Sequence, residues 1–323
     1  MGSLENPRRT GPAHIVEFEL SRAELMVCGF RKTTGEHFTP TIHHDTYPAI
    51  DVSHSVGMVG KHVFLTGASR GIGKSMALAY AKAGASIIGI SARSDLGSVK
   101  KEIEDAATSV GREVPKVVTA NMDVLDPESV QRAVEKMTPD FDGRLDIVIS
   151  NAGYMEPWTN MIEADVQEWW RSWEVNIRGQ FVTWKAVLPL LLADDSSLKT
   201  IVNMSSIGAQ MCVPGASAYQ TTKFALLRLT DFLNVEYGAQ GVIAYCMHPG
   251  AVPTELSWKM PDFVKVNLID TPELMADTVV YLTQKRREWL RGRYLSCNWD
   301  MAELVDMQDE IVETDKLKMR MVV

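Results

Sequence analysis

The chain has 323 residues, of which 46 % are hydrophobic and 8 % aromatic, and it carries a formal net charge of −8. This composition is typical of a globular protein with an apolar core. Partners that require a basic face, such as nucleic acid or an anionic membrane surface, are not expected. No window reaches the roughly 20 consecutive apolar residues of a membrane-spanning helix, so no membrane partner is predicted.

The cysteines are widely separated, and no pair has the C-x-x-C spacing of a zinc site. They therefore indicate reduced thiols in a reducing compartment rather than a disulfide framework. The first residues contain no apolar core of signal-peptide length. A cytoplasmic protein without a metal site is expected. The cysteines are Cys28, Cys212, Cys246 and Cys297.

Residues 1–57 differ from the rest of the chain, because they hold five of the seven histidines and several prolines. His43, His44 and Asp45 raise the alternative of a metal site. Adjacent side chains rarely converge on one ion, and no further ligands are apparent. We therefore interpret this segment as an N-terminal extension that wraps the surface.

From Lys61 onward, apolar runs alternate with helical patterns. Continuous apolar runs are typical of parallel strands that are covered on both faces. Helices are predicted at 74–83, 127–137 and 217–237, and Asp126-Pro127 provides an N-cap and a first-position proline for one of them. The predicted strands are 62–65, 86–90, 116–119, 145–149, 200–204, 242–246 and 293–296.

This alternation predicts an α/β fold with a doubly wound parallel sheet of about seven strands in a single domain. We place the catalytic domain at 58–298 and a C-terminal helical tail at 299–323. Asp300 to Lys318 reads as a charged amphipathic helix that packs on the domain or on a second subunit.

The first predicted strand runs directly into a glycine-rich turn and a helix. This context is the one in which a Rossmann-type fold binds a dinucleotide. Glycines allow the sharp turn and the close approach of backbone to pyrophosphate, and the helix N-terminus favours phosphate. The candidate cofactor residues of the turn are Thr66, Gly67, Ser69, Arg70, Gly71, Ile72 and Gly73.

The second predicted strand ends in Ile90-Ser-Ala-Arg93, which offers no carboxylate for a free ribose 2′-hydroxyl. Arg93 and Arg70 suit a 2′-phosphate instead, so NADP(H) is predicted over NAD(H). The alternative is that Arg93 is a solvated residue at a helix start. Asp95, two residues further on, is the main argument for that alternative.

Tyr219 and Lys223 are four residues apart, which places both side chains on one face of a helix. A lysine ammonium beside a phenol favours the phenolate, so we expect the pKa of Tyr219 to fall toward neutrality. Such a tyrosine can exchange a proton at working pH. Together with the glycine turn, the pair indicates a nicotinamide-dependent oxidoreductase.

These motifs closely resemble those of the classical short-chain dehydrogenase/reductase family over roughly residues 58–298. Thr66–Gly73 matches T-G-x-x-x-G-x-G, Ser150-Asn-Ala-Gly153 resembles N-N-A-G, and Val175-Asn-Ile-Arg-Gly179 matches N-x-x-G. The resemblance implies that Asn176 is a proton-relay residue. It also implies cofactor contacts from Asp123, Val124, Asn151, Ala152, Gly153, Tyr219, Lys223, Pro249, Gly250, Val252 and Thr254.

In this family a catalytic serine lies about a dozen residues before the tyrosine. Ser206 has the better spacing, and alternation at the strand end turns Ser205 the other way. The resemblance thus implies a catalytic tetrad of Asn176, Ser206, Tyr219 and Lys223. Ser206 and Tyr219 would polarise a carbonyl, and Lys223 would bind the nicotinamide ribose. Subunits of the family commonly form dimers or tetramers.

The resemblance places a variable lid after Gly250, within 255–265, where Trp258, Met260 and Phe263 suit an apolar ligand. Met155, Trp158, Met211 and Val213 are further candidates for the same pocket, and ordinary loop packing is the alternative for each. The tryptophan cluster at 169–173 with Trp184 lies near the subunit-pairing helix, so we interpret it as packing or interface.

The predicted function is an NADPH-dependent carbonyl reductase, or the reverse dehydrogenase, acting on an apolar ketone or alcohol. The terminal segments resemble those of fungal members, many of which act in secondary metabolism. Two alternatives stay open. One is a non-redox or epimerising enzyme, which would form product without net NADPH consumption. The other is a non-catalytic nucleotide sensor, which would bind without turnover.

Overall fold

The computed structural model describes residues 34–55 and 57–321, and it contains a seven-stranded parallel sheet in the order β3-β2-β1-β4-β5-β6-β7. This order confirms the predicted doubly wound α/β fold. Every apolar run that was predicted as a strand lies in the sheet, with ends that differ by at most two residues. The strands are β1 His62–Thr66, β2 Ile87–Ala92, β3 Lys116–Asn121, β4 Ile147–Ser150, β5 Thr200–Met204, β6 Ile243–His248 and β7 Tyr294–Ser296.

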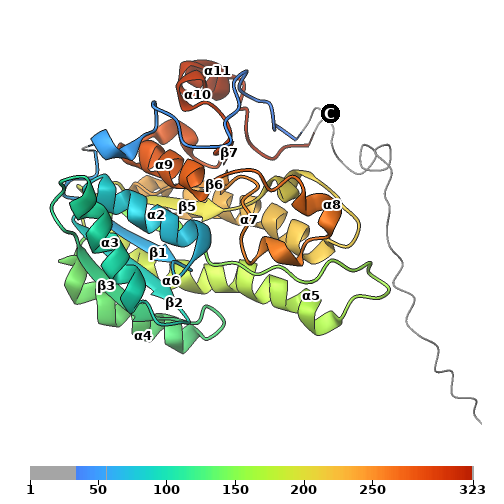
Figure 1. Ribbon diagram of the computed structural model, residues 1–323, viewed down its shortest axis with the longest axis horizontal. Helices are drawn as coiled ribbons and strands as arrows, with labels where there is room; N and C mark the ends of the chain where they lie inside the picture. Colours follow the sequence, from blue (N-terminus) through green and yellow to red (C-terminus); the bar gives the residue numbers. More distant parts are fainter. Residues whose placement is uncertain (1–33, 56, 322–323) are drawn as a thin grey trace, which may run out of the picture.

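Helices cover both faces of the sheet, which explains why β2, β4, β5 and β6 are buried along their whole length. In Figure 1, α2 Gly71–Lys82 packs beside α3 Gly97–Ser109 and α9 Pro272–Thr283. The other layer contains α4 Pro127–Met137, α5 Val166–Trp173, α6 Gly179–Leu192 and α7 Ser217–Tyr237. A short α8 Asp262–Lys265 lies after β6. Within the described residues, no helix combines the length and apolarity needed to cross a membrane.

Local sequence signals account for the helix ends. Asp126 caps α4 by accepting a hydrogen bond from Glu128 N, and Pro127 occupies the first turn. Both α4 and α7 have the predicted bounds. The predicted start of α2 at Lys74 is three residues too late, because the last glycines of the turn already form the first helical turn.

The prediction of one continuous helix over 300–318 is wrong. The tail forms α10 Met301–Asp306 and α11 Gln308–Glu313, and then it turns. Asp315 and Leu317 adopt φ values of 51° and 64°, in the left-handed region that a helix cannot contain. The turn directs Leu317 O to Tyr294 N at 2.8 Å, so the tail packs against the edge strand of its own sheet.

Residues 35–47 lie beside the C-terminal tail, as Figure 1 shows at the top of the molecule, whereas the short helical turn Val52–His54 packs on α2 and α9. The indole nitrogen of Trp299 donates to Gly35 O at 2.9 Å, and Thr41 Oγ1 donates to Glu303 at 2.6 Å. This part of the predicted extension therefore packs on the surface, as expected. The boundaries at 57 and 298 stay predictions, and Cys28 lies outside the described residues.

The neighbouring histidines of this segment have different partners. His43 Nε2 lies 2.9 Å from Asp300, whereas His44 Nδ1 lies 2.6 Å from Asp270. The two rings therefore diverge instead of facing one ion. Over residues 34–55 and 57–321, no three His, Cys, Asp or Glu side chains are grouped as metal ligands.

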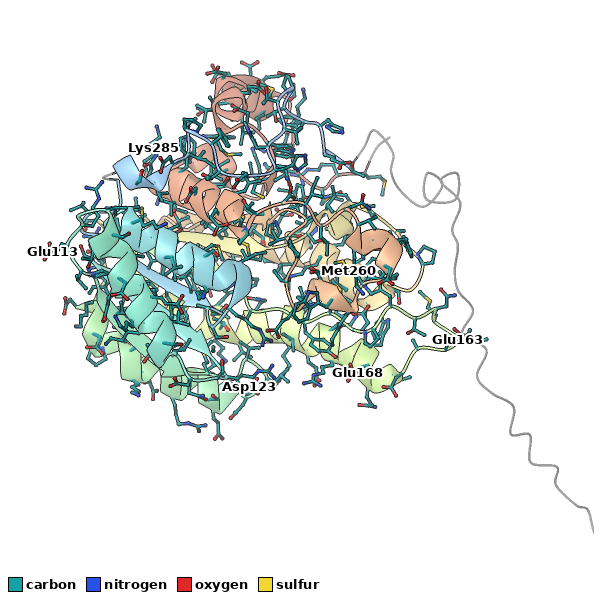
Figure 2. The ribbon with its side chains drawn as sticks, in the orientation of Figure 1. Glu113, Asp123, Glu163, Glu168, Met260 and Lys285 are labelled. Carbon is teal, nitrogen blue, oxygen red and sulfur yellow. The ribbon has the colours of Figure 1, made fainter. Side chains whose placement is uncertain are left out.

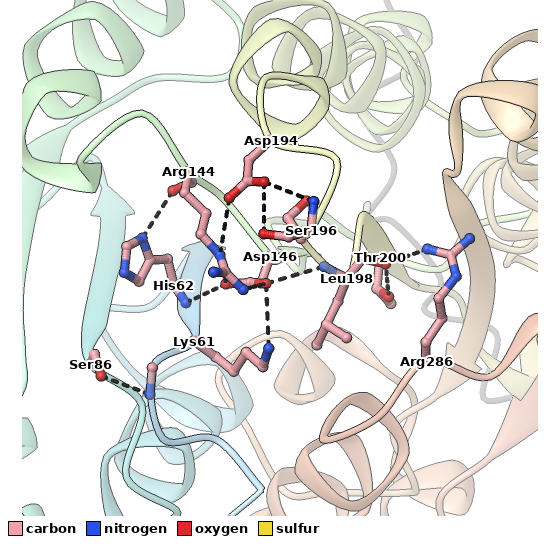
Figure 3. A network of polar contacts seen from close by, with 12 residues as sticks. Lys61, His62, Ser86, Arg144, Asp146, Asp194, Ser196, Leu198, Thr200 and Arg286 are labelled. Carbon is pink, nitrogen blue, oxygen red and sulfur yellow. Dashed lines mark hydrogen bonds and ion pairs between the residues drawn. The ribbon is translucent and has the colours of Figure 1, made fainter.

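A buried carboxylate joins three strands at the end of the sheet where the strands begin (Figure 3). Asp146, just before β4, accepts hydrogen bonds from His62 N at 3.0 Å and Leu198 N at 3.1 Å. Arg144 adds two more, at 3.0 and 2.8 Å. These contacts connect the starts of β1, β4 and β5, at the edge opposite the predicted cofactor residues.

Candidate active site

The predicted functional residues gather at the carboxyl edge of the sheet. Figure 2 shows Met260 and Glu168 near this edge, at the other end of the molecule from Glu113 and Lys285. The strand order changes direction between β1 and β4. In open α/β sheets, ligands bind in the crevice outside the strand ends at such a switch point.

The glycine turn and the segment after β4 are joined by hydrogen bonds. Thr66 Oγ1 accepts from Asn151 N at 3.1 Å and from Ala152 N at 3.0 Å. Asn151 Nδ2 donates to the carbonyl oxygens of Thr66 and Gly67, both at 3.0 Å. Gly67 has φ +66°, and a Cβ there would lie 2.9 Å from Ala152 Cα, so only glycine fits this contact.

The residues of the turn suit a pyrophosphate. Gly71, Ile72 and Gly73 form the first turn of α2, and Arg70 at the N-cap position makes no capping side-chain hydrogen bond in the described chain. Free amides and the positive end of the helix dipole therefore face the switch point. Thr254 packs on Gly71, since a Cβ on Gly71 would lie 3.5 Å from Thr254 Cγ2.

The predicted adenosine contacts lie at the ends of β2 and β3. Arg93 follows β2 with an exposed side chain, and its carbonyl oxygen accepts from Asn121 Nδ2 at 2.7 Å. Asp123 accepts from Leu125 N at 3.0 Å, and Val124 packs on Gly179. Arg70 forms a 2.6 Å ion pair with Glu255, so its guanidinium is directed toward the lid.

The four residues of the predicted tetrad converge. Tyr219 and Lys223 share one face of α7, with Lys223 Nζ 5.5 Å from the centre of the Tyr219 ring. The Ser206 hydroxyl acts to lower the pKa of Tyr219, which indicates that it lies beside the phenol. Asn176 lies on a π-helical turn at 174–178, a local irregularity that is frequent at functional sites. Its Nδ2 donates to Thr222 Oγ1 at 3.0 Å.

The geometry separates the two serine candidates. Ser205 is buried, and its hydroxyl donates to the backbone oxygen of Lys223 at 3.0 Å. Ser206 instead caps the short helical turn after β5 by accepting from Gly208 N at 3.0 Å. Of the two serines, Ser206 therefore contacts the tyrosine.

The expectation that Lys223 lowers the pKa of Tyr219 toward neutrality is wrong. Burial raises the pKa of Tyr219 to about 12, and the hydrogen bond from Ser206 offsets only part of this effect. Burial also lowers the pKa of Lys223 to about 8. The ammonium donates to Met204 O at 2.7 Å.

Glu156 was not predicted from the sequence, yet it contacts α7, the helix that carries Tyr219 and Lys223. It is 4 % exposed, its Oε1 accepts from Tyr219 N at 3.0 Å, and its Oε2 accepts from Ser172 Oγ at 2.6 Å. Its negative charge also contributes to the raised pKa of Tyr219. Ala216, the N-cap residue of α7, has no capping side chain. Glu156 therefore supplies that cap from the loop after β4.

The predicted pocket residues fall into two groups. Met155 is fully buried, so it belongs to the core instead of an open pocket. Trp258 is 65 % exposed on the lid, and Lys259 Nζ lies 4.0 Å from the centre of the Tyr154 ring. Trp158 Nε1 is buried without a hydrogen-bond partner among the described residues.

The fold and the glycine turn at its switch point define a dinucleotide-binding α/β protein. The chain belongs to the short-chain dehydrogenase/reductase family of oxidoreductases: the family model for short chain dehydrogenase matches residues 61–264. The short chain dehydrogenase citE of Monascus ruber is 48 % identical over 293 residues, covering 91 % of this chain and 99 % of that protein. The short chain dehydrogenase andI of Emericella variicolor is 41 % identical over 284 residues, covering 88 % and 96 %.

Solved structures agree with this assignment. A putative short chain dehydrogenase from Pseudomonas syringae is 27 % identical, covers 76 % of this chain and 97 % of its own, and has a TM-score of 0.66. The 3-ketoacyl-(acyl-carrier-protein) reductase from Brucella melitensis, complexed with NADH, is 25 % identical, covers 74 % and 97 %, and has a TM-score of 0.65.

Proposed function

We propose that the protein is an NADP(H)-dependent oxidoreductase that interconverts a ketone or aldehyde with an alcohol, acting as a reductase on an apolar small molecule. The cluster of Ser206, Tyr219 and Lys223 carries this proposal, because the Ser206 hydroxyl acts to lower the pKa of the phenol and the Lys223 ammonium lies 5.5 Å from the centre of its ring. Membership of an oxidoreductase family supports it.

The chain's own residues perform the acid chemistry. Bound nicotinamide supplies the hydride. Ser206 and Tyr219 donate hydrogen bonds to the substrate carbonyl oxygen and stabilise the negative charge that develops there. Tyr219 transfers its phenolic proton to that oxygen, so the carbonyl gains a hydride and a proton and becomes an alcohol. A pKa of about 12 keeps the phenol protonated at neutral pH.

Lys223 and Asn176 restore the proton. With a pKa of about 8, Lys223 is mostly cationic at neutral pH and stabilises the phenolate that Tyr219 leaves behind. It is also the residue that we expect to hold the nicotinamide ribose. A Cβ on Gly153 would lie 3.5 Å from Asn176 Oδ1 and 3.7 Å from Lys223 Nζ, so both groups border one small space. We propose a water-mediated relay through it.

Preference for NADP(H) rests on Arg93. Its side chain is exposed at the end of β2, and Asp95 already accepts a hydrogen bond from Gly97 N at 3.1 Å. A guanidinium there pairs with a 2′-phosphate. The pairing of Arg70 with Glu255 leaves Arg93 as the main support.

We expect Arg93→Ala to weaken NADPH binding about tenfold or more, because a charge-assisted hydrogen bond is lost, with NADH binding little changed. Titration followed by nicotinamide fluorescence measures both constants. Lys100→Ala, which removes an equal charge from α3, serves as the control. Equal loss for both cofactors, or tighter NADH binding by the wild type, contradicts the proposed preference.

The substrate class is proposed from the lid and the family. The exposed indole of Trp258 on the lid favours an apolar ligand. The similar proteins from Monascus ruber and Emericella variicolor support the resemblance of this chain to fungal members of the family. We propose a role in secondary metabolism, and the cytoplasmic location stays a prediction.

A homodimer or homotetramer is also proposed. Large apolar side chains are exposed on neighbouring helices, including Trp170 on α5, Phe181 on α6 and Phe224 and Phe232 on α7. Such surfaces are commonly covered by a partner, and a second copy is the partner that the family implies. Sedimentation analysis gives the molar mass, and a monomer at micromolar concentration overturns this proposal.

The proposed reaction is tested by incubating the protein with NADPH and a panel of apolar ketones and aldehydes. Consumption of NADPH with at least one of them is expected. Nucleotide binding without turnover of any compound favours the sensor alternative. The epimerising alternative requires product without net consumption of cofactor.

A further inference from the structure

The loop that contains the predicted lid at 255–265 is closed at its base by one residue, Asp270. Its backbone N–H donates to Ala251 O at 3.1 Å, and its carboxylate accepts from Ala251 N at 2.5 Å. Residues 252–269 therefore form a loop that is closed at its base by Ala251 and Asp270. The backbone at Gly250 lies close to the Asp270 carboxylate, since a Cβ on Gly250 would lie 2.8 Å from Asp270 Oδ2.

The same carboxylate is held from two other parts of the chain. Asp270 is 4 % exposed, and Asn298 Nδ2 donates to its Oδ2 at 2.9 Å. His44 Nδ1 lies 2.6 Å from its Oδ1. Because a buried carboxylate is stable only when its oxygens are hydrogen-bonded, the side chain of His44 completes the set of donors.

Hydrogen bonds to Thr271 hold the backbone around His44 next to the base of the lid. Thr271 N donates to His44 O at 3.0 Å, and Thr271 Oγ1 donates to Asp45 at 2.6 Å. The imidazole of His44 therefore contacts Asp270 from a segment whose backbone is hydrogen-bonded to Thr271, the residue that follows Asp270. A segment more than 200 positions away in the sequence reaches the lid in this way.

We propose that His44 and Asp270 are positioning residues, through which the N-terminal segment fixes the base of the lid and the loop 249–254. This inference rests on the proposed function in one respect only, namely that this loop contacts the nicotinamide. Neither residue touches the reacting atoms. Their role is to keep the backbone of Ala251, and with it Val252 and Thr254, in one arrangement.

The test compares three variants of the full chain. His44→Ala removes the donor to Asp270. His44→Asn keeps a donor at nearly the position of Nδ1 and serves as the rescue. His43→Ala is the matched control, because His43 pairs with Asp300 of the tail and stacks on Tyr47 with ring centres 3.5 Å apart.

The first readout is hydrogen exchange of the peptide containing Ala251, measured on protein without added cofactor. We expect about tenfold faster exchange in His44→Ala, because a hydrogen bond to a charged group is lost at the clamp. Near wild-type exchange is expected in His44→Asn and in His43→Ala. If His44→Ala does not fold, His44→Asn and Asp270→Asn are compared with the wild type in its place.

The second readout is steady-state kinetics with NADPH. His44→Ala is expected to raise the KM for NADPH severalfold with a smaller change in kcat, and His44→Asn restores the KM. Unchanged exchange in His44→Ala, or equal effects of His43→Ala, overturns the inference. Failure of the wild type to turn over NADPH overturns the proposed function alone, since the exchange result does not depend on it.

Discussion

Replacing Tyr219 by phenylalanine is expected to lower carbonyl reduction by about 10²–10⁴-fold, the usual contribution of a positioned general acid. The hydroxyl is the only part of the side chain that is lost, so the packing of the buried ring is retained. NADPH affinity should change little, because the ring that shapes the site is retained and only the proton-donating hydroxyl is removed. Single-turnover kinetics at saturating NADPH measures the effect on the chemical step.

The paired serines provide an internal control for this result. Ser206→Ala removes the hydroxyl that acts to lower the pKa of Tyr219 and that we propose to bind the substrate carbonyl, so a large loss of rate is expected. Ser205→Ala removes a hydroxyl that bonds only the Lys223 backbone oxygen, so a much smaller loss is expected. Retention of full activity in Tyr219→Phe, or a larger effect of Ser205 than of Ser206, contradicts the proposed acid chemistry.

Asp146→Ala is expected to cost about 3–5 kcal/mol of the free energy of unfolding, as breaking a buried ion pair typically does. Asp146 is fully buried, and its removal leaves His62 N and Leu198 N without their acceptor. Unsatisfied buried donors add to the loss of the Arg144 pair. Urea unfolding at fixed protein concentration measures the change.

Asp140→Ala is the matched control, because Asp140 pairs with Lys116 on the surface at 3.1 Å. An exposed pair of this kind contributes about 0–1 kcal/mol. A loss below about 1 kcal/mol for Asp146→Ala as well would mean that the network in Figure 3 does not stabilise the sheet.

The fold was predictable because its signals are local. Buried parallel strands appear as continuous apolar runs, and the cap formed by Asp126 and Pro127 marks the start of α4 to the residue. The convergence of Asn176, Ser206, Tyr219 and Lys223 was likewise predictable. Motifs at fixed positions along a doubly wound fold meet at the strand ends.

The missed features all depend on contacts between distant segments. Nothing beside Glu156 in the sequence indicates that it caps α7, since its partner Tyr219 lies 63 positions away. The raised pKa of Tyr219 follows from burial, which a Y-x-x-x-K spacing does not report. The tail was predicted as one helix because its amphipathic pattern does not show the left-handed turn at Asp315 and Leu317.

NADPH-dependent carbonyl reduction with Tyr219 as the proton donor is tested most directly by the stoichiometry of the reaction with a substrate from the carbonyl panel. NADPH consumed and alcohol formed are quantified in the same sample, for the wild type and for Tyr219→Phe. If Tyr219 donates the proton, we expect the wild type to consume one NADPH for each alcohol formed and the variant to form almost no product. Product formed without net loss of NADPH, or at an equal rate in Tyr219→Phe, would contradict it.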